Sequence, residues 1–174
     1  MLVFLSGGAR SGKSSIAVRA AARRLTPVTV VATATAGDEE MAERIARHQR
    51  DRPDHWSLVE EPVDLLGAVG SVAPDQTLIV DCLALWLSNR LSERPQEILD
   101  ETLRLADLLA ERSERAYVVS NEVGSGIVPP DALTRGFRDL LGSVNQRMAQ
   151  RADSAYLCVA GMLVPLERNA EFDV

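Results

Sequence analysis

Short apolar stretches alternate with longer amphipathic stretches along this chain of 174 residues. The apolar stretches have the length and β-branched content of buried strands, and the amphipathic stretches repeat their apolar residues with the period of a helix. Strands are predicted over residues 1–5, 28–32, 57–61, 77–81, 116–120 and 154–159, and helices over 14–25, 38–50, 62–69, 82–91, 96–114 and 131–151. This alternation predicts an α/β fold, with one parallel sheet covered by helices on both faces.

The pattern also indicates how some segments lie in this fold. Residues 57–61 are predicted as an edge strand, and Gly136 and Gly142 are expected to interrupt the last helix. Residues 161–174 show little pattern. A single domain over residues 1–174 is expected, because a chain of this length can bury one substantial core. The helix that begins at Pro62 is predicted to turn four side chains inward: Val63, Leu65, Leu66 and Val69.

Between the first strand and the first helix, the segment GGARSGKS matches the phosphate-binding pattern G-x-x-x-x-G-K-[ST]. Glycines allow successive backbone N–H groups to point at phosphate oxygens, and the start of a helix adds a partial positive charge there. Lys13 would reach the outer phosphates, the Ser14 hydroxyl would ligate Mg²⁺, and Arg10 adds a cation. The segment predicts binding of a nucleoside triphosphate and leaves the reaction open. Its residues are Gly7, Gly8, Ala9, Arg10, Ser11, Gly12, Lys13 and Ser14.

Other polar residues follow the carboxyl ends of predicted strands, which is the edge where open α/β sheets bind ligands. Asp81 ends an apolar strand, as does the Mg²⁺-holding acid of the second nucleotide-binding motif. Thr33 and Thr35 lie just past residues 28–32, where they would either meet a nucleotide or serve as turn hydroxyls. The polar, glycine-bearing loop 121–130 would have a substrate or switch role at this edge, or would be an inert connector.

The chain has two histidines. Met41, Ile45 and His48 fall on one face of the helix over 38–50, with Arg52 one turn beyond the histidine. From spacing alone, a half-buried structural role is favoured for His48. His55 lies in a loop beside Trp56, where a turn residue is expected.

Charge and cysteine content restrict the function further. Lys and Arg number 19 and Asp and Glu number 25, so the net charge of −6 disfavours binding to nucleic acid or to anionic membranes. No apolar run approaches the roughly 18 residues of a membrane span, and Met1 leads directly into the first strand. A cytoplasmic protein acting on small molecules is therefore expected. Cys82 and Cys158 are far apart and predict buried thiols, without a disulfide framework or a zinc site.

Specific motifs extend along the chain to about Gly161. They are the phosphate loop, DEEMAERI at 38–45 with His48 and Arg52-Pro53, Trp56 and Glu60, Asp81-Cys82-Leu83 with Trp86 and Asn89, SNEVGSGIVP at 120–129, and Phe137-Arg138-Asp139 with Gly142 and Asn145-Gln146. Together these motifs resemble the bifunctional adenosylcobinamide kinase / adenosylcobinamide-phosphate guanylyltransferase family of cobalamin (vitamin B12) biosynthesis.

The resemblance implies two reactions on a RecA-like P-loop scaffold. First, a nucleoside triphosphate, GTP with ATP as an alternative, phosphorylates the hydroxyl of the aminopropanol arm of adenosylcobinamide. GTP then donates GMP to a histidine and releases pyrophosphate, and adenosylcobinamide phosphate accepts the GMP to give adenosylcobinamide-GDP. His48 matches the guanylylated histidine of the family, which reverses the role favoured by spacing. A neutral imidazole is a good nucleophile at phosphorus.

The resemblance also assigns the remaining site residues. Residues 7–14, with Lys13 as a catalytic residue, correspond to the GTP phosphate site. Ser14 and Asp81 correspond to the Mg²⁺ site. Some members have a second histidine in place of Arg47, which suggests that a histidine pair is dispensable, and some have Glu at position 81. A ring-shaped homotrimer is implied, with the site near a subunit boundary and the helix of His48 free to move. Further nucleotide contacts are implied for Thr33, Thr35, Arg52 and Glu60.

Two other functions fit the phosphate loop. One is a P-loop kinase of another small alcohol with no histidine intermediate. The other is a nucleotide-dependent switch, in which hydrolysis changes the shape of the loop 121–130. Both would leave adenosylcobinamide without a nucleotide attached.

Overall fold

The computed structural model describes residues 1–168 and is built around a seven-stranded sheet with the strand order β3-β2-β4-β5-β1-β6-β7. Neighbouring strands are parallel except for the antiparallel pair β6–β7. The predicted parallel sheet and the edge position of β3 are confirmed. The strands are β1 Leu2–Gly7, β2 Val28–Ala32, β3 Ser57–Glu60, β4 Thr77–Asp81, β5 Ala116–Val119, β6 Ser154–Val159 and β7 Met162–Leu166.

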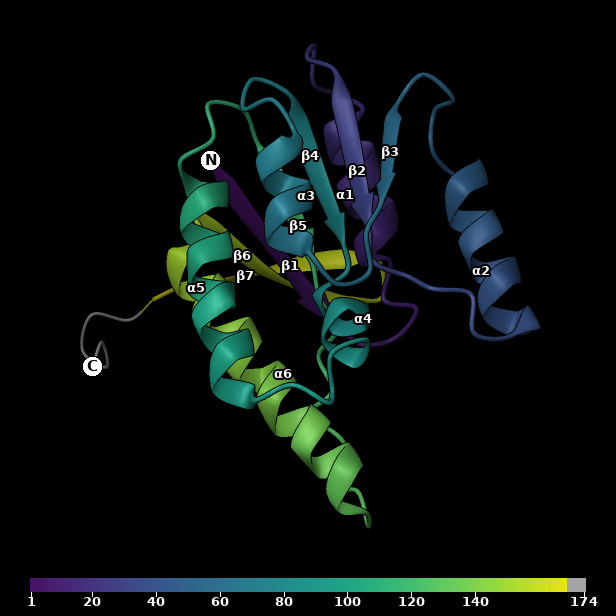
Figure 1. Cartoon of the computed structure of the whole chain (residues 1–174). Helices are drawn as coiled ribbons and strands as arrows, with labels where there is room; N and C mark the ends of the chain where they lie inside the picture. The colour runs from purple at the N-terminus through teal and green to yellow at the C-terminus, as the bar shows by residue number, and fades with distance from the viewer. Residues whose placement is uncertain (169–174) are drawn as a thin grey trace.

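Helices cover both faces of this sheet, as predicted. Helix α1 packs on β1, β4 and β5 behind the sheet in Figure 1, whereas α3 and α5 lie in front of it. Helix α6 packs along α5 and β1, and α2 stands to one side, beyond β3 (Figure 1). The helices are α1 Lys13–Ala21, α2 Glu39–Arg50, α3 Leu65–Ser71, α4 Leu83–Ser88, α5 Pro95–Ala110 and α6 Ala132–Arg151.

The central strands β1, β4 and β5 form the middle of the core. Every residue of β1 and β5 is buried, and so is β4 up to its last residue, Asp81. Continuous apolar runs are expected where helices cover both faces, because no side chain of the strand then reaches water. The strands therefore deliver their polar end residues to one edge of the sheet on a rigid base.

Several predicted boundaries were wrong. Helix α1 ends at Ala21 rather than 25, because the chain turns there and leaves Leu25 fully exposed. Val63 is 45% exposed, since Asp64 caps α3 through Gly67 N and the helix begins only at Leu65. The predicted helices over 82–91 and 96–114 are shorter, at Leu83–Ser88 and Pro95–Ala110. Helix α6 runs unbroken through both glycines, because glycine can adopt helical angles at a modest cost and buried side chains such as Leu141 and Val144 hold the helix on the core.

Strand β7 was missed by the sequence pattern. Its sequence, MLVPL, is apolar throughout and so lacks the alternation of a half-buried strand, although all five residues are exposed. Pro165 fits there because β7 is an edge strand, where a missing N–H breaks no pairing. The part of the predicted patternless end after residue 168 lies outside the described residues. Among the helices of residues 1–168, none is long and apolar enough to cross a membrane.

Candidate active site

The phosphate loop joins β1 to α1 and closes around Lys13. Gly12, the N-cap of α1, has φ +97°, a conformation that side-chain-bearing residues rarely adopt. The Lys13 side chain is buried, and its Nζ donates a hydrogen bond to Gly8 O at 2.9 Å. Strand, glycine loop and helix therefore occur in the predicted order, with the lysine amino group inside the loop.

Asp81, at the end of β4, is the meeting point of three side chains. Ser14 Oγ donates a hydrogen bond to its Oδ1 at 3.2 Å. His48 Nδ1 and Arg52 Nη2 each lie 3.5 Å from its Oδ2. Burial would raise the pKa of the Asp81 carboxyl, but contacts with His48, Arg52 and Ser14 outweigh burial and lower it below 3.8. Asp81 is therefore an ionised carboxylate shared between the phosphate loop and the segment that carries His48.

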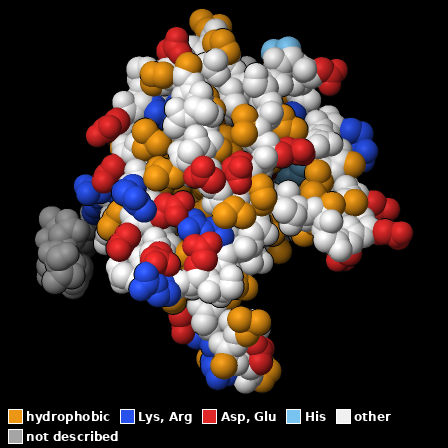
Figure 2. Space-filling view, viewed as in Figure 1, with side chains coloured by type: hydrophobic (Ala, Val, Ile, Leu, Met, Phe, Trp, Pro, Cys, Tyr) orange, Lys and Arg blue, Asp and Glu red, His pale blue; other side chains and the backbone are white. Residues whose placement is uncertain are grey.

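Helix α2 brings His48 to this carboxylate. Asp38 caps the helix by accepting a hydrogen bond from Met41 N at 2.8 Å. Met41, Ile45 and His48 line one cavity together, so the predicted shared face is confirmed. Figure 2 shows the surface hollowed where the lobe bearing α2 meets the body of the molecule. The helix thus forms one wall of the cavity above the ends of the strands.

Two cavities adjoin His48. The first lies between α2 and the strand ends, with apolar and polar walls. The second lies over the phosphate loop and is lined by residues 10–15 and the polar side of α2, including Arg47. Lys13, Ser14 and His48 line both cavities. A nucleotide with its phosphates in the second cavity and its nucleoside in the first would therefore pass beside the imidazole.

Thr33, for which the resemblance implies a nucleotide contact, is not among the residues that line the two cavities. This threonine is fully buried, and its hydroxyl donates to Cys82 O at 2.7 Å and accepts from Cys82 N at 2.9 Å. Its hydroxyl is thus engaged in tying the end of β2 to the end of β4. Thr35 is exposed, and Ala34 rather than Thr35 is among the residues that line the first cavity.

The other predicted residues lie where contact with a ligand is possible. Arg52 and Glu60 line the first cavity together with Asp81. Burial lowers the pKa of the Arg52 guanidinium, although Asp81 opposes this shift. His55 is exposed in the turn between α2 and β3 and is not among the residues that line the two cavities.

Gln49 was missed, although its position could have been predicted. It lines the first cavity, and its Nε2 donates a hydrogen bond to Glu60 Oε1 at 3.3 Å. Gln49 follows Ile45 by four residues, so helical spacing alone places it on the cavity face. The contact links α2 to the end of β3.

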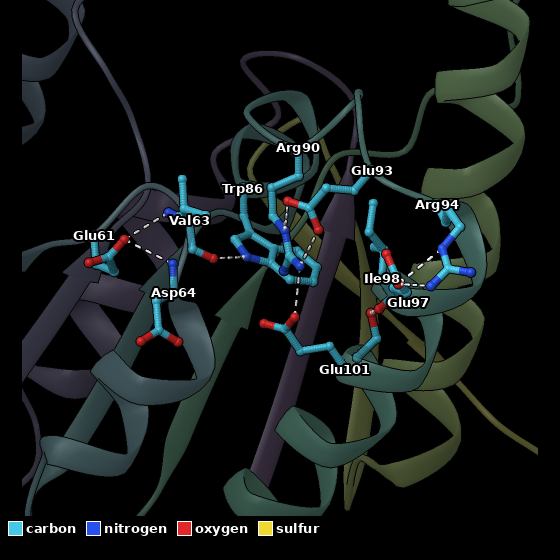
Figure 3. A network of polar contacts seen from close by, with 11 residues as sticks. Glu61, Val63, Asp64, Trp86, Arg90, Glu93, Arg94, Glu97, Ile98 and Glu101 are labelled. Carbon is cyan, nitrogen blue, oxygen red and sulfur yellow. Dashed lines mark hydrogen bonds and ion pairs between the residues drawn. The ribbon is translucent and has the colours of Figure 1, made fainter.

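Helix α4, which follows Asp81, is fixed by an ion-pair network (Figure 3). Trp86 Nε1 donates to Val63 O at 2.9 Å, and the Arg90 guanidinium lies 4.8 Å from the centre of the Trp86 ring. Arg90 also pairs with Glu93 at 2.6 Å and Glu101 at 2.8 Å. These contacts join α4 to α5 and to the segment before α3, and they hold the wall of the first cavity.

Both cysteines are buried free thiols, as predicted. Burial, followed by the nearby Asp81 carboxylate, raises the pKa of the Cys82 thiol to about 11, so this thiol stays protonated at neutral pH. Among residues 1–168, no group of three or more His, Cys, Asp or Glu side chains could hold a metal ion on its own.

Sequence comparison finds relatives over nearly the whole chain. A family model described as "Cobinamide kinase / cobinamide phosphate guanyltransferase" matches residues 3–166. The "Bifunctional adenosylcobalamin biosynthesis protein CobP" of Pseudomonas aeruginosa is 44% identical, covering 94% of this chain and 96% of the relative. The "Bifunctional adenosylcobalamin biosynthesis protein CobU" of Salmonella typhimurium is 34% identical, covering 96% of this chain and 100% of the relative.

Solved structures with a similar fold are more distant in sequence. The RadB recombinase matches with a TM-score of 0.52 at 16% identity, covering 90% of this chain and 73% of RadB. The flagellar accessory protein FlaH of Methanocaldococcus jannaschii matches with a TM-score of 0.51 at 13% identity, covering 93% of this chain and 74% of FlaH. These neighbours confirm the RecA-like P-loop fold.

Proposed function

Since this chain belongs to the cobinamide kinase / cobinamide phosphate guanyltransferase family, we propose that it makes adenosylcobinamide-GDP through a guanylylated His48. The chain phosphorylates adenosylcobinamide with GTP or ATP, and then transfers GMP from GTP to adenosylcobinamide phosphate in cobalamin biosynthesis. The observation that carries the assignment to His48 is its position beside the phosphate loop, where it lines both cavities and faces Asp81.

The kinase step uses the phosphate loop. Backbone N–H groups of residues 7–14 hold the phosphates, and Lys13 neutralises charge on the transferred group. Ser14 and Asp81 fit Mg²⁺, because a hydroxyl and a carboxylate oxygen already meet at 3.2 Å and both are hard oxygen ligands. Such an ion commonly takes one or two protein ligands and completes its shell with phosphate and water, and it would neutralise the phosphates during transfer.

The guanylyl step uses the imidazole of His48. Its Nδ1 faces Asp81, so Nε2 is the nitrogen left to attack the α-phosphorus of GTP. A bond forms between Nε2 and phosphorus, the bond to the bridging oxygen of the β-phosphate breaks, and pyrophosphate leaves. A phosphate oxygen of adenosylcobinamide phosphate then attacks the same phosphorus and breaks the P–N bond. His48 is returned to its neutral form.

The remaining assignments complete the proposal. Arg52 and Glu60 contact the nucleotide from the first cavity, and Thr35 contacts it only if the segment before α2 moves. The functional unit is a cytoplasmic homotrimer. An oligomer is supported by the exposed apolar side chains of β7, of which Met162 is 69% exposed. Light scattering of the purified protein tests the trimer.

The guanylyl step is tested with GTP labelled at its α-phosphate. Wild-type protein should gain an acid-labile, base-stable label, and His48→Ala should gain none. His55→Ala is the matched control and should be labelled like the wild type, because His55 lies outside the cavities. An unlabelled wild-type protein that still phosphorylates a small alcohol would favour the simpler kinase. Slow GTP hydrolysis that leaves adenosylcobinamide unchanged would favour the switch.

A further inference from the structure

The hairpin of β6 and β7 contacts the phosphate loop from outside the cavities. Its turn, Ala160-Gly161, has positive φ angles of 51° and 78°. Gly161 N donates a hydrogen bond to Ser11 O at 2.9 Å. The Cys158 thiol donates to the same oxygen, with its Sγ at 3.0 Å. One carbonyl of the phosphate loop thus accepts two hydrogen bonds from residues far away in sequence.

The fit between the hairpin and the loop is close. A Cβ atom on Gly7 would lie 2.4 Å from Cys158 O, and one on Gly12 would lie 3.3 Å from Gly161 Cα. The backbone of the hairpin therefore occupies the space that side chains at these two motif positions would need. Glycine is therefore needed at positions 7 and 12 for two reasons. It lets the hairpin backbone come close, and it allows the positive φ angles of 153° and 97°.

The hydrogen bonds to Ser11 O have a consequence inside the cavity. In a planar trans peptide, the C=O and the N–H point in opposite directions. Because the hairpin holds Ser11 O outward, the N–H of Gly12, which belongs to the same peptide unit, is turned away from the hairpin. Ser11, Gly12 and Lys13 line the second cavity, where the phosphates would lie. The contact thus pre-orients the N–H of Gly12, which would donate a hydrogen bond to a phosphate oxygen.

We propose that Gly161 and Cys158 are positioning residues of the phosphate site, which orient the Ser11–Gly12 peptide for a diphosphate or triphosphate group. This inference rests on the proposed function, because it takes residues 7–14 as the phosphate site. Neither residue is among those that line the two cavities, so each acts through the loop. Together they reduce the ordering that phosphate binding would otherwise require of the loop.

Two substitutions at Gly161 separate backbone conformation from side-chain volume. A Cβ at this position meets no atom within 4 Å, so the site has room for a side chain. Asn tolerates a positive φ, whereas a β-branched Val strongly resists it. Gly161→Val should weaken binding of inorganic pyrophosphate and of GTP alike, by about tenfold. Gly161→Asn should recover most of this affinity, because it keeps the turn and the N–H.

Binding of pyrophosphate, GTP and guanosine to each variant is measured by calorimetry, with the melting temperature recorded in parallel. Guanosine binding should not change, since the hairpin acts on the phosphates. A purely structural turn would lower the melting temperature of Gly161→Val and leave its pyrophosphate affinity like that of the wild type, which would overturn the inference. Wild-type protein that binds neither GTP nor pyrophosphate would instead overturn the proposed function.

Cys158→Ala provides a second test that leaves the turn unaltered. It removes one of the two donors to Ser11 O, and should weaken pyrophosphate binding by about threefold to fivefold. Cys158→Ser keeps a donor and should lose less. If Gly161→Val does not fold, the two Cys158 variants decide alone. The inference would then be overturned if both bind pyrophosphate as tightly as the wild-type protein does.

Discussion

The phosphate loop and helix α2 both contact Asp81, but the surrounding structure holds them in different ways. The loop continues a fully buried strand, encloses the buried Lys13, and is contacted by the β6–β7 hairpin. Helix α2 has no buried side chain among its described residues, and it packs extensively on no other helix or strand of residues 1–168. Its contacts with the strand ends include the polar ones made by His48 and Gln49.

The difference suits the proposed function, in which one phosphate loop serves both reactions. Phosphoryl transfer requires the outer phosphate to be open to an acceptor, whereas guanylyl transfer requires an imidazole at the inner phosphorus. A rigid loop can hold the phosphates of the nucleotide spent in the first step and then those of the GTP that enters for the second. A loosely held helix can approach for one step and withdraw for the other. We therefore infer that α2 moves while the loop stays fixed.

The largest expected effect is on the loop. Lys13→Ala removes the cation inside the loop, so GTP binding should weaken and phosphoryl transfer should slow by at least about a hundredfold. His48→Ala, which changes helix α2, should abolish the covalent label and leave GTP binding within a few-fold of that of the wild type. Calorimetry and a corrinoid phosphorylation assay measure both. A full kinase rate in Lys13→Ala would disprove the assignment of the loop.

The second prediction concerns local stability and needs no substitution. Backbone amides of α2 should exchange with solvent at least about a hundredfold faster than those of α5, because few buried contacts oppose opening of α2. Hydrogen exchange followed by mass spectrometry measures this difference. Helix α5 is a suitable reference because it buries Ile98, Leu105 and Leu109. Equal protection of α2 and α5 would remove the basis for a moving helix.

Much of the fold could be predicted because its physical causes are local. Buried parallel strands must be apolar throughout, and helices on a sheet must carry an apolar stripe, so both patterns appear in the sequence. Strand β7 is also apolar throughout, but its proline argues against a strand and its side chains are exposed, so the pattern does not identify it. The hydrophobic periodicity of residues 38–50 also does not reveal that α2 packs on few neighbours. Its face of Met41 and Ile45 lines a cavity rather than packing on a neighbour.

The residues of the candidate site also divide into those that a local pattern predicts and those that it does not. The phosphate loop and Asp81 follow from spacing and from the ends of strands. The role proposed for His48 rests on family resemblance, because spacing alone favours a structural histidine. The engagement of the Thr33 hydroxyl could not be predicted, because its partner Cys82 is 49 residues away and only the fold brings it close.

A smaller effect is expected from the helix caps, where two substitutions form a matched pair. Asp38 caps α2 and Asp64 caps α3, each by accepting one backbone N–H. Each Asp→Ala change should cost its helix about 1 kcal/mol. Asp64→Ala should lower the global free energy of unfolding, because α3 buries Leu65 and Val69. Asp38→Ala should leave it unchanged and speed hydrogen exchange in α2 by about fivefold.

These two outcomes are measured by urea denaturation and hydrogen exchange. If Asp38→Ala lowers global stability as much as Asp64→Ala, then α2 unfolds together with the rest of the protein. The contrast between a fixed loop and a separately opening helix would then fail.

The smallest effect is expected in the firmly packed body of the molecule, at the ion pair of Arg90 and Glu93. The hydrogen bond from Arg90 lowers the pKa of Glu93 below its ordinary value of 4.5. A lowered folded-state pKa stabilises the protein above about pH 4.5, and this contribution is lost as pH falls through the folded-state value. Glu93→Gln should therefore reduce the free energy of unfolding by about 0.5 kcal/mol at pH 7, and by less at pH 4.

Glu97→Gln is the matched control for this substitution. The Arg94–Glu97 pair has the same spacing, but its side chains are 82% and 49% exposed, against 8% and 33% for Arg90 and Glu93. Solvent screens an exposed pair, so Glu97→Gln should lose less stability than Glu93→Gln at pH 7. Urea denaturation of both variants at pH 7 and pH 4 makes the comparison. If Glu97→Gln costs as much as Glu93→Gln, burial beside Trp86 does not strengthen the Arg90 pair, and α4 is held no more firmly than a surface helix.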